Sequence, residues 1–205
     1  MLYVLMGKSS SGKDTVYKRL TGNAGIAIDK IVTYTTRPMR ENEVQDREYH
    51  FVDEKEMEKL EKSGKVVERR SYNTVYGQWN YFTVDDGSFD VANRDYIIIG
   101  TLESFEKIVA YFGNDKVKPL YLQIDDGARL ERALERERQE KSPKYAEMCR
   151  RYLADEKDFC EENLTKLGID IRFDNDDIEE CVDEIKKYIN CTNNIKSTVS
   201  LTMDL

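Results

Sequence analysis

Short apolar runs along the chain alternate with longer stretches in which apolar positions recur every three or four residues. The runs at 2–6, 26–32, 96–100, 117–124 and 169–173 predict strands, and the run at 96–100 has the β-branched character of a strand buried on both faces. The periodic stretches predict helices at 15–20, 126–138, 145–167 and 177–189. Strands that alternate with helices indicate an α/β fold with a mainly parallel sheet.

Between residues 33 and 90 the pattern changes to segments rich in Tyr, Val and Phe. The segments 66–72 and 75–84 predict two antiparallel strands, with Asn73 and Thr74 as turn residues between them. Residues 53–63 predict a helix with Asp53 as its N-cap and Gly64 as its end. We therefore expect a mixed lobe, residues 33–90, inserted into a core that is formed by residues 1–32 and 91–190.

The last residues, 191–205, form a polar tail with apolar residues at Val199, Leu201, Met203 and Leu205. Strict alternation of this kind is typical of a strand. Polar chain ends are also commonly disordered, so both interpretations of the tail stay open.

The charge balance limits the classes of partner. The chain has 32 Lys and Arg against 40 Asp and Glu, a formal net charge of -8. General nucleic-acid binding is disfavoured, because neutralising a phosphate backbone requires an excess of basic residues. No apolar run approaches the roughly 20 residues of a membrane span, and the first residues do not form a secretory signal. We expect a cytoplasmic protein that binds neither nucleic acid nor membrane.

Cysteine and histidine usage narrows the possible chemistry. The four cysteines contain no CxxC pair and no disulfide framework, which favours free thiols on helices. His50 is the only histidine, so His-rich zinc sites are excluded, as are Ser-His and Cys-His nucleophile pairs unless His50 itself serves. Hydrolase and zinc-enzyme functions are therefore disfavoured.

A glycine-rich segment follows the first predicted strand and precedes the first predicted helix. Residues 7–15, GKSSSGKDT, match the phosphate-binding pattern GxxxxGK, with Asp14 where Ser or Thr is usual. Glycines in such a loop let backbone N–H groups converge on a phosphate at the positive end of a helix. Lys13 would reach the β- and γ-phosphates of a nucleotide, and Asp14 or Thr15 would help to hold Mg²⁺ directly or through water.

A second basic segment lies in the predicted lobe. Arg37 and Arg40 stand three residues apart in a proline-containing loop, followed by Tyr49 and later by Tyr76. Arginine binds phosphate oxygens bidentately through its planar guanidinium, and phenol hydroxyls add donors without charge. These residues predict a second phosphate site. Ion pairs with neighbouring glutamates at the surface are the alternative.

The order and spacing of these residues resemble the guanylate kinase family. The family pattern has a phosphate loop, then TTRxxRxxEVxxxxYxF, then an acidic residue ahead of a Tyr-Gly pair. In this chain it is formed by Thr35, Thr36, Arg37, Arg40, Glu43, Val44, Tyr49, Phe51, Glu68, Tyr76 and Gly77. The segment 174–177, DNDD, is similar to the family's late strand-to-helix turn. The resemblance therefore covers about residues 1–190 and leaves the tail unexplained.

The resemblance implies a P-loop kinase core with a mainly parallel sheet flanked by helices, an inserted acceptor-binding lobe, and a helical lid at about residues 132–155. It implies phosphoryl transfer from ATP, with Mg²⁺, to a nucleoside monophosphate, with GMP or dGMP as the expected acceptor. Small nucleotides are thus the expected partners. The sequence leaves the oligomeric state open.

The resemblance also assigns roles to individual positions. The residues expected to bind ATP are Gly7, Ser9, Ser10, Ser11, Gly12, Lys13, Asp14, Thr15 and Asn175, with Asp14 and Thr15 at the metal. Those expected to bind the acceptor are Thr33, Arg37, Arg40, Glu43, Tyr49, Glu68, Tyr76 and Thr101, with Glu68 and Thr33 facing the guanine. The expected catalytic residues are Lys13, Arg37, Arg136 and Arg151, and Arg132 and Arg138 are further lid candidates.

Three departures from the family pattern weaken the implied base and metal contacts. Asp14 replaces Ser or Thr, Gln78 follows the Tyr-Gly pair where a small hydroxyl residue is usual, and Thr101 lies in a segment where the family carries Asp-x-Asp. Two alternatives therefore stay open. The first is a kinase for another small phosphorylated acceptor, and the second is a guanylate-kinase-like binding module that has lost catalysis.

Overall fold

The computed structural model describes residues 1–22, 25–74 and 77–203, and leaves the side chains of residue 74 and residues 194–203 undescribed. The chain divides into two compact units. The first unit contains residues 1–4 and 29–118, and the second contains residues 5–28 and 119–205. This division differs from the predicted core, lobe and tail, whose boundaries stay a prediction.

The first unit contains two sets of strands and two helices. Strands β2 (Asp29–Lys30) and β7 (Tyr96–Ile99) pair in parallel and follow the order β2-β7-β1 with the first residues of β1 (Leu2–Gly7). A second sheet has the order β4-β3-β6-β5. Its strands are β3 (Tyr34–Thr35), β4 (His50–Phe51), β5 (Val66–Thr74) and β6 (Gly77–Val84). The helices are α2 (Glu54–Lys62) and α3 (Leu102–Phe112).

Helix α2 begins and ends where its sequence predicts. The Asp53 carboxylate accepts a hydrogen bond from the backbone N–H of Glu56 at 2.8 Å, which satisfies one of the unpaired donors of the first turn. Gly64, at φ +71°, follows the last turn. The helix contributes Met57 to a small core with Phe82 and Val84, and this core fixes the helix on the second sheet.

The predicted antiparallel pair is confirmed, but its turn is not where the sequence indicated. Asn73 pairs with Gln78 and Thr74 with Gly77, so both expected turn residues belong to β5. Aromatic contacts extend the ladder, because the ring of Tyr72 lies 5.8 Å from that of Tyr81 across the strands. The link between the strands falls on residues 75–76, which lie outside the described residues.

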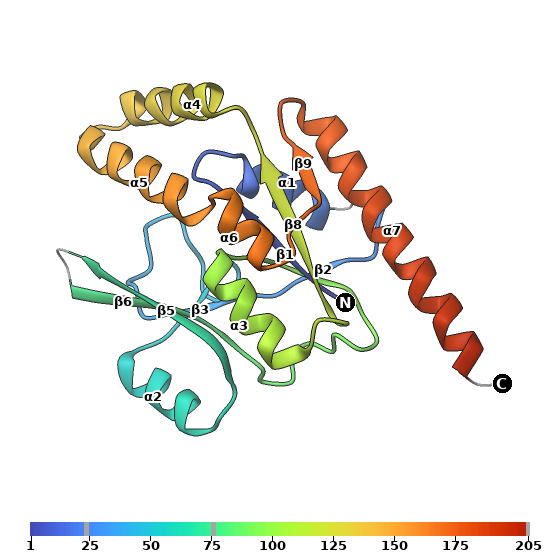
Figure 1. The fold of residues 1–205 in the computed structure, drawn as a ribbon. Coiled ribbons are helices and arrows are strands. Elements are labelled where there is room, and N and C mark those ends of the chain that lie inside the picture. The colour runs from blue at the N-terminus through green and yellow to red at the C-terminus, as the bar shows by residue number, and fades with distance from the viewer. Residues whose placement is uncertain (23–24, 75–76, 204–205) are drawn as a thin grey trace. The chain divides into compact units, whose positions relative to one another are not determined.

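The second unit contains the later residues of β1, in the strand order β1-β8-β9. Strand β8 (Val117–Gln123) pairs in parallel with β9 (Arg172–Asp174). The helices are α1 (Lys13–Thr21), α4 (Asp126–Gln139), α5 (Tyr145–Asp158), α6 (Glu161–Lys166) and α7 (Ile178–Met203). Helix α1 contacts α7, and α4 lies beside α5 (Figure 1). The predicted α/β fold with a mainly parallel sheet flanked by helices is confirmed.

The single helix predicted over residues 145–167 is wrong, because the structure has two. Helix α5 ends at Asp158 and α6 begins at Glu161. Between them Phe159 is buried and its ring stacks on that of Tyr121 at 5.7 Å, while Cys160 adopts an extended backbone. The helical periodicity of the sequence runs through Phe159, but the helix breaks there, where the Phe159 ring packs on Tyr121.

Three further predictions differ from the structure at the ends of elements. Of the strands expected at 26–32 and 169–173, only Asp29–Lys30 and Arg172–Asp174 are strand. The strand suggested by the alternation at the end of the tail is wrong, since α7 continues to Met203. Val199 and Met203 are four residues apart, a spacing that a helix also places on one face.

All four cysteines are free thiols, but Cys160 lies between helices rather than on one. Burial raises the pKa of the Cys181 thiol to about 12. Within the described ranges, no helix combines the length and apolarity that crossing a membrane requires.

Candidate functional site

The segment between β1 and α1 forms a tight loop that requires glycine at two positions. Gly12 has φ +90°, and a Cβ atom there would lie 2.2 Å from Nδ2 of Asn175. Gly7 has φ +153°, and a Cβ atom there would lie 2.7 Å from the backbone oxygen of Leu122. The loop therefore approaches its neighbours more closely than any residue with a side chain allows.

Helix α1 starts directly from this loop. The carbonyl of Gly12 accepts hydrogen bonds from the backbone N–H groups of Thr15 and Val16 at 3.0 and 3.1 Å. No described side chain caps the helix. The positive end of the helix is consequently left for an anion, as expected of a phosphate-binding loop.

Lys13 is folded back over the loop. Its Nζ donates hydrogen bonds to the carbonyl oxygens of Gly7 at 2.7 Å and Lys8 at 2.8 Å. Burial lowers the pKa of Lys13 to about 8, against the opposing effect of the nearby Asp155 and Asp14 carboxylates. Lys13 is therefore a desolvated cation beside the loop, where its interaction with an anion is strengthened.

Asn175 joins the loop to the strand-to-helix turn after β9. Its Nδ2 donates to the carbonyl of Ser11 at 2.7 Å, and its backbone N–H donates to the carbonyl of Gln123 at 2.9 Å. Buried Oδ1 of Asn175 and buried Oγ atoms of Ser10 and Ser11 have no hydrogen-bond partner within the described part of the chain. Buried polar atoms of this kind are normally paired, so they indicate a polar ligand.

The loop opens onto a pocket of about 490 Å³ within the second unit. The pocket is lined by Ser10, Gly12, Lys13, Asp14, Thr15, Arg132, Arg136, Asn175, Asp176 and Ile178. Three of these side chains are cationic and two are carboxylates, which favours a polyanion that brings a cation with it. The structure thus brings most of the predicted ATP-binding residues together.

The predicted metal ligands are on the wall of this pocket. Asp14 and Thr15 are exposed and offer oxygen atoms. No cluster of three or more His, Cys, Asp or Glu suited to a metal ion occurs among the described residues. This donor set fits Mg²⁺, which typically binds one or two carboxylates together with substrate phosphates and water.

Three of the four predicted lid arginines line cavities together with residues of the phosphate loop. Arg136 and Arg151 line a second, small cavity together with Ser9 and Ser10, so both residues lie beside the phosphate loop. Arg132 donates weakly to the carbonyl of Asn175 at 3.4 Å. Arg138 lines neither cavity.

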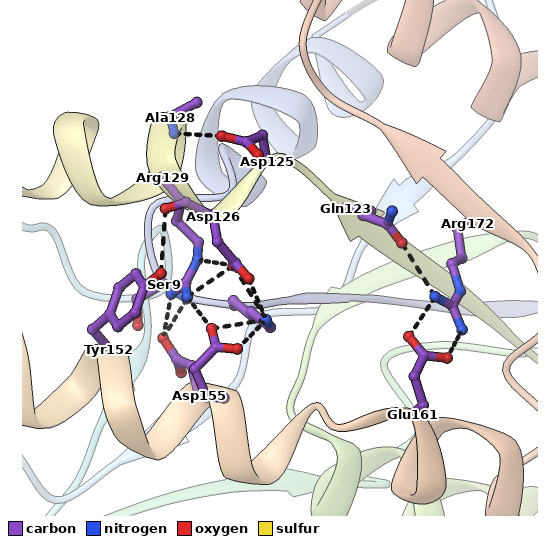
Figure 2. Close-up of polar contacts among 12 residues, drawn as sticks. Ser9, Gln123, Asp125, Asp126, Ala128, Arg129, Tyr152, Asp155, Glu161 and Arg172 are labelled. Carbon is purple, nitrogen blue, oxygen red and sulfur yellow. Dashed lines mark hydrogen bonds and ion pairs between the residues drawn. The ribbon is translucent and has the colours of Figure 1, made fainter.

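Sequence reasoning missed Arg129, the centre of a buried charged cluster in the second unit (Figure 2). Arg129 is 1% exposed and its guanidinium contacts Asp126 at 3.1 Å, Asp155 at 3.5 Å and Glu156. The ring of Tyr152 lies 3.9 Å from the guanidinium carbon. The cluster joins α4 to α5, and α4 itself is capped by Asp125, which accepts from the N–H of Ala128.

The same cluster holds the beginning of the phosphate loop. Lys8 Nζ donates to both oxygens of Glu156 at 2.8 Å and to Asp126 at 3.2 Å. The backbone N–H of Ser9 donates to the carboxylate of Asp155 at 2.8 Å (Figure 2). A signal for these contacts is nearly absent from the sequence, where only the i,i+3 spacing of Asp126 and Arg129 suggests a pair.

In the first unit, Arg37 is buried and engaged by Glu43. Its two terminal nitrogens bind the Glu43 carboxylate at 2.7 and 2.9 Å, which lowers the pKa of that carboxyl. The guanidinium carbon also lies 5.5 Å from the rings of both Tyr49 and Phe51. The ion pair expected as an alternative thus exists, but it is buried rather than solvated.

The other expected phosphate ligands of this unit differ in accessibility. The Arg40 side chain is exposed, and its backbone N–H donates to Glu43 at 2.8 Å. The Tyr49 ring packs edge-on against Tyr81 at 5.7 Å. Tyr76 lies outside the described residues.

The residues expected at the guanine occupy three different settings. Glu68 is buried on β5 and accepts hydrogen bonds from Thr83 and Arg70. Thr33 is half-buried, and its carbonyl accepts from the N–H of His50 at 2.9 Å. Thr101 is the N-cap of α3, in a capping box with Ser104. A local structural role therefore accounts for Thr101, and its expected contact with the base stays a prediction.

Comparison with known proteins places this geometry in a family. The sequence profile of guanylate kinase matches residues 1–192. The guanylate kinase of Lactiplantibacillus plantarum is 40% identical over 78 residues, 38% of each chain, and that of Rhodopirellula baltica is 27% identical over 135 residues, 65% of this chain and 63% of the relative. The chain thus aligns with less than two thirds of the length of these curated relatives.

A solved structure shows the same fold over a longer range. The crystal structure of guanylate kinase from Anaplasma phagocytophilum matches 93% of this chain and 85% of its own, with a TM-score of 0.64 at 18% sequence identity. The profile match extends from the phosphate loop through the Arg37 segment to the turn at Asn175. On this evidence, the chain belongs to the guanylate kinase family.

Proposed function

We propose that the protein transfers the γ-phosphoryl group of ATP to GMP, giving ADP and GDP. The observation that carries this proposal is the phosphate loop with its pocket, which is lined by the desolvated Lys13 and by Ser10 and Asn175, two residues whose buried side-chain oxygens have no hydrogen-bond partner among the described residues. Family membership supports GMP as the acceptor, with dGMP as its close analogue.

On the donor side, the loop backbone and the start of α1 would bind the ATP phosphates. Lys13 would exchange its bonds to two backbone carbonyls for bonds to phosphate oxygens. Arg132 and Arg136 would add positive charge from α4. Because these groups are held in position before the reaction, little reorganisation is needed when charge develops on the transferring group.

Asp14 and Thr15 would hold Mg²⁺ directly or through water. When bound, the metal would neutralise part of the negative charge of the triphosphate. The Asp14 carboxylate then meets a cation rather than the bare triphosphate. Without that cation, an exposed carboxylate on the pocket wall would repel the ligand.

On the acceptor side, the exposed guanidinium of Arg40 would bind the GMP phosphate, together with Tyr49 and Tyr76. Arg37 would contribute through the one nitrogen, Nε, that Glu43 and Pro38 leave without a hydrogen-bond partner among the described residues. Glu68 and Thr33 would face the guanine. Glu43 would position both arginines by accepting from the Arg37 side chain and the Arg40 backbone.

The reaction requires no nucleophilic side chain, because the acceptor phosphate itself attacks. Catalysis of phosphoryl transfer depends on holding donor and acceptor in line and on neutralising the oxygens of the transferring group. Lys13, Arg136 and Arg151 would supply that charge at the donor. The scarcity of histidine is therefore compatible with the activity. The cytoplasmic location expected from the sequence stays a prediction.

A coupled assay of ADP release with GMP, dGMP, AMP, CMP and UMP tests the proposal. We expect transfer to GMP and dGMP. Lys13→Ala should reduce the rate by about 10²–10³, whereas Lys18→Ala, an exposed lysine on the same helix, should leave it unchanged. A different preferred acceptor, or ATP binding without transfer to any acceptor, would contradict the proposal.

A further inference from the structure

Glu68, the residue expected to select the base, shares its carboxylate with a neighbouring arginine, Arg70. Glu68 and Arg70 are two residues apart on β5 and therefore lie on the same face of the sheet. Arg70 donates from Nε to Oε2 of Glu68 at 3.1 Å and from Nη2 to Oε1 at 3.4 Å. The carboxylate is 0% exposed and the Arg70 side chain 14%.

A second donor reaches the same carboxylate from the neighbouring strand. Thr83 stands opposite Glu68 in the register of β5 and β6, and its hydroxyl donates to Oε1 at 2.9 Å. Each oxygen of a carboxylate accepts about two hydrogen bonds. Oε1 therefore already accepts from both Thr83 and Arg70, whereas Oε2 accepts from Arg70 alone and has the capacity for one further donor.

Purine bases differ in how many donors they bring to such a carboxylate. Guanine presents two, the N–H groups at N1 and N2, and needs a free position on each oxygen. Hypoxanthine lacks the 2-amino group and presents only the N–H at N1. Oε2 can accept that single donor with Arg70 in place, whereas the second donor of guanine competes with Arg70 for Oε1.

We propose that Arg70 is a specificity-determining residue of the acceptor site, which suppresses recognition of the 2-amino group by occupying Oε1 of Glu68. This inference rests on the proposed function, because it takes Glu68 to be the residue that faces the base. The protein then accepts GMP and IMP with similar efficiency. Removing Arg70 makes Oε1 of Glu68 available to the 2-amino group of guanine, so that kcat/KM becomes higher for GMP than for IMP.

The experiment compares kcat/KM for GMP and IMP in the wild type and in Arg70→Ala. We expect a ratio within about threefold of one in the wild type. In Arg70→Ala the ratio should favour GMP by about tenfold or more, the usual effect of one hydrogen bond to a charged group. Arg69→Ala is the matched control, since Arg69 points to Glu61 at 2.6 Å and not to Glu68.

Two further variants separate selectivity from folding. Arg70→Met keeps an apolar stem of similar length without donors, and should show the same gain if Arg70→Ala does not fold. Adding Glu68→Gln to either variant should abolish the gain, because the second acceptor oxygen is then replaced by an amide N–H₂. Calorimetric titration with GMP and IMP gives the same ratio independently of turnover.

The outcomes distinguish this inference from the proposed function. An unchanged GMP to IMP ratio in both Arg70 variants, or a wild type that already prefers GMP more than tenfold, would overturn the role of Arg70 alone. If neither nucleotide is bound or phosphorylated by any variant, both the proposed function and the inference are overturned.

Discussion

The carboxylate of Asp155 accepts a hydrogen bond from the backbone N–H of Ser9 at 2.8 Å, which links helix α5 to the phosphate loop. Asp155 is one of the two carboxylates on α5 that contact this part of the loop, the other being Glu156, the partner of Lys8. A negative side chain therefore occupies a donor that the sequence assigns to phosphate. Nucleotide binding must compete with it or tolerate its charge.

Asp155→Asn should strengthen ATP binding by about three- to tenfold, because one unit charge near the triphosphate is removed while an acceptor oxygen for Ser9 is kept. The affinity is measured at pH 6.5, where Lys13 stays protonated in both proteins. The gain should shrink at high ionic strength. Asp158→Asn, on the exposed last turn of the same helix, should change nothing, and weaker binding in Asp155→Asn would contradict the argument.

The pH dependence of ATP binding should reflect Lys13. Burial lowers the pKa of Lys13 to about 8 in the free protein, so the fraction that carries a positive charge falls as the pH rises through 8. ATP affinity should therefore decrease between about pH 7 and pH 9. Lys13→Arg keeps its charge over this range, so its affinity, even if lower, should stay constant. An identical decrease in both proteins would assign the titration to another group.

Arg129→Met should destabilise the second unit. The variant leaves the carboxylates of Asp126, Asp155 and Glu156 without their shared buried cation. All three carboxylates retain some exposure and regain water, so we expect a loss of about 1–3 kcal/mol rather than the full cost of a buried unpaired charge. Arg150→Met, which breaks an exposed pair with Glu147, should cost less than about 1 kcal/mol. Denaturant-induced unfolding measures the free energy of unfolding of both variants and of the wild type.

The parts of the fold that depend on local pattern were predicted well. Glycine spacing and the strand before it located the phosphate loop, and Asp53 located the start of α2. The break at Phe159 escaped prediction because it depends on packing against Tyr121, 38 residues earlier in the chain. Asp155 escaped for the same reason, since its partner Ser9 is 146 residues away and no sequence spacing encodes that contact.

The Mg²⁺ requirement tests Asp14. If its carboxylate helps to hold the metal, Asp14→Ala should raise the Mg²⁺ concentration for half-maximal rate by about tenfold, and Asp183→Ala on α7 should not. If Asp14 only stabilises the positive end of α1, the Mg²⁺ titration should not shift. The free energy of unfolding should then fall by about 0.3–1 kcal/mol. The two results are distinguished by measuring the titration and thermal unfolding on the same samples.

Base selection by Glu68 gives the sharpest test of the acceptor site. Guanine offers an N–H donor at N1 that a carboxylate accepts, whereas adenine offers an acceptor there, and a buried carboxylate facing it would lose its partner. Sites of this kind discriminate by up to about 10⁴–10⁵. Because Arg70 and Thr83 already satisfy Glu68 in part, the preference for GMP over AMP should lie below that ceiling.

Glu68→Gln should reduce this preference more than it reduces the maximal rate, since the amide keeps the shape of the site but replaces one acceptor. Glu61→Gln, at the exposed partner of Arg69, serves as the control. Equal kcat/KM for GMP and AMP in the wild type would contradict a guanine site at Glu68.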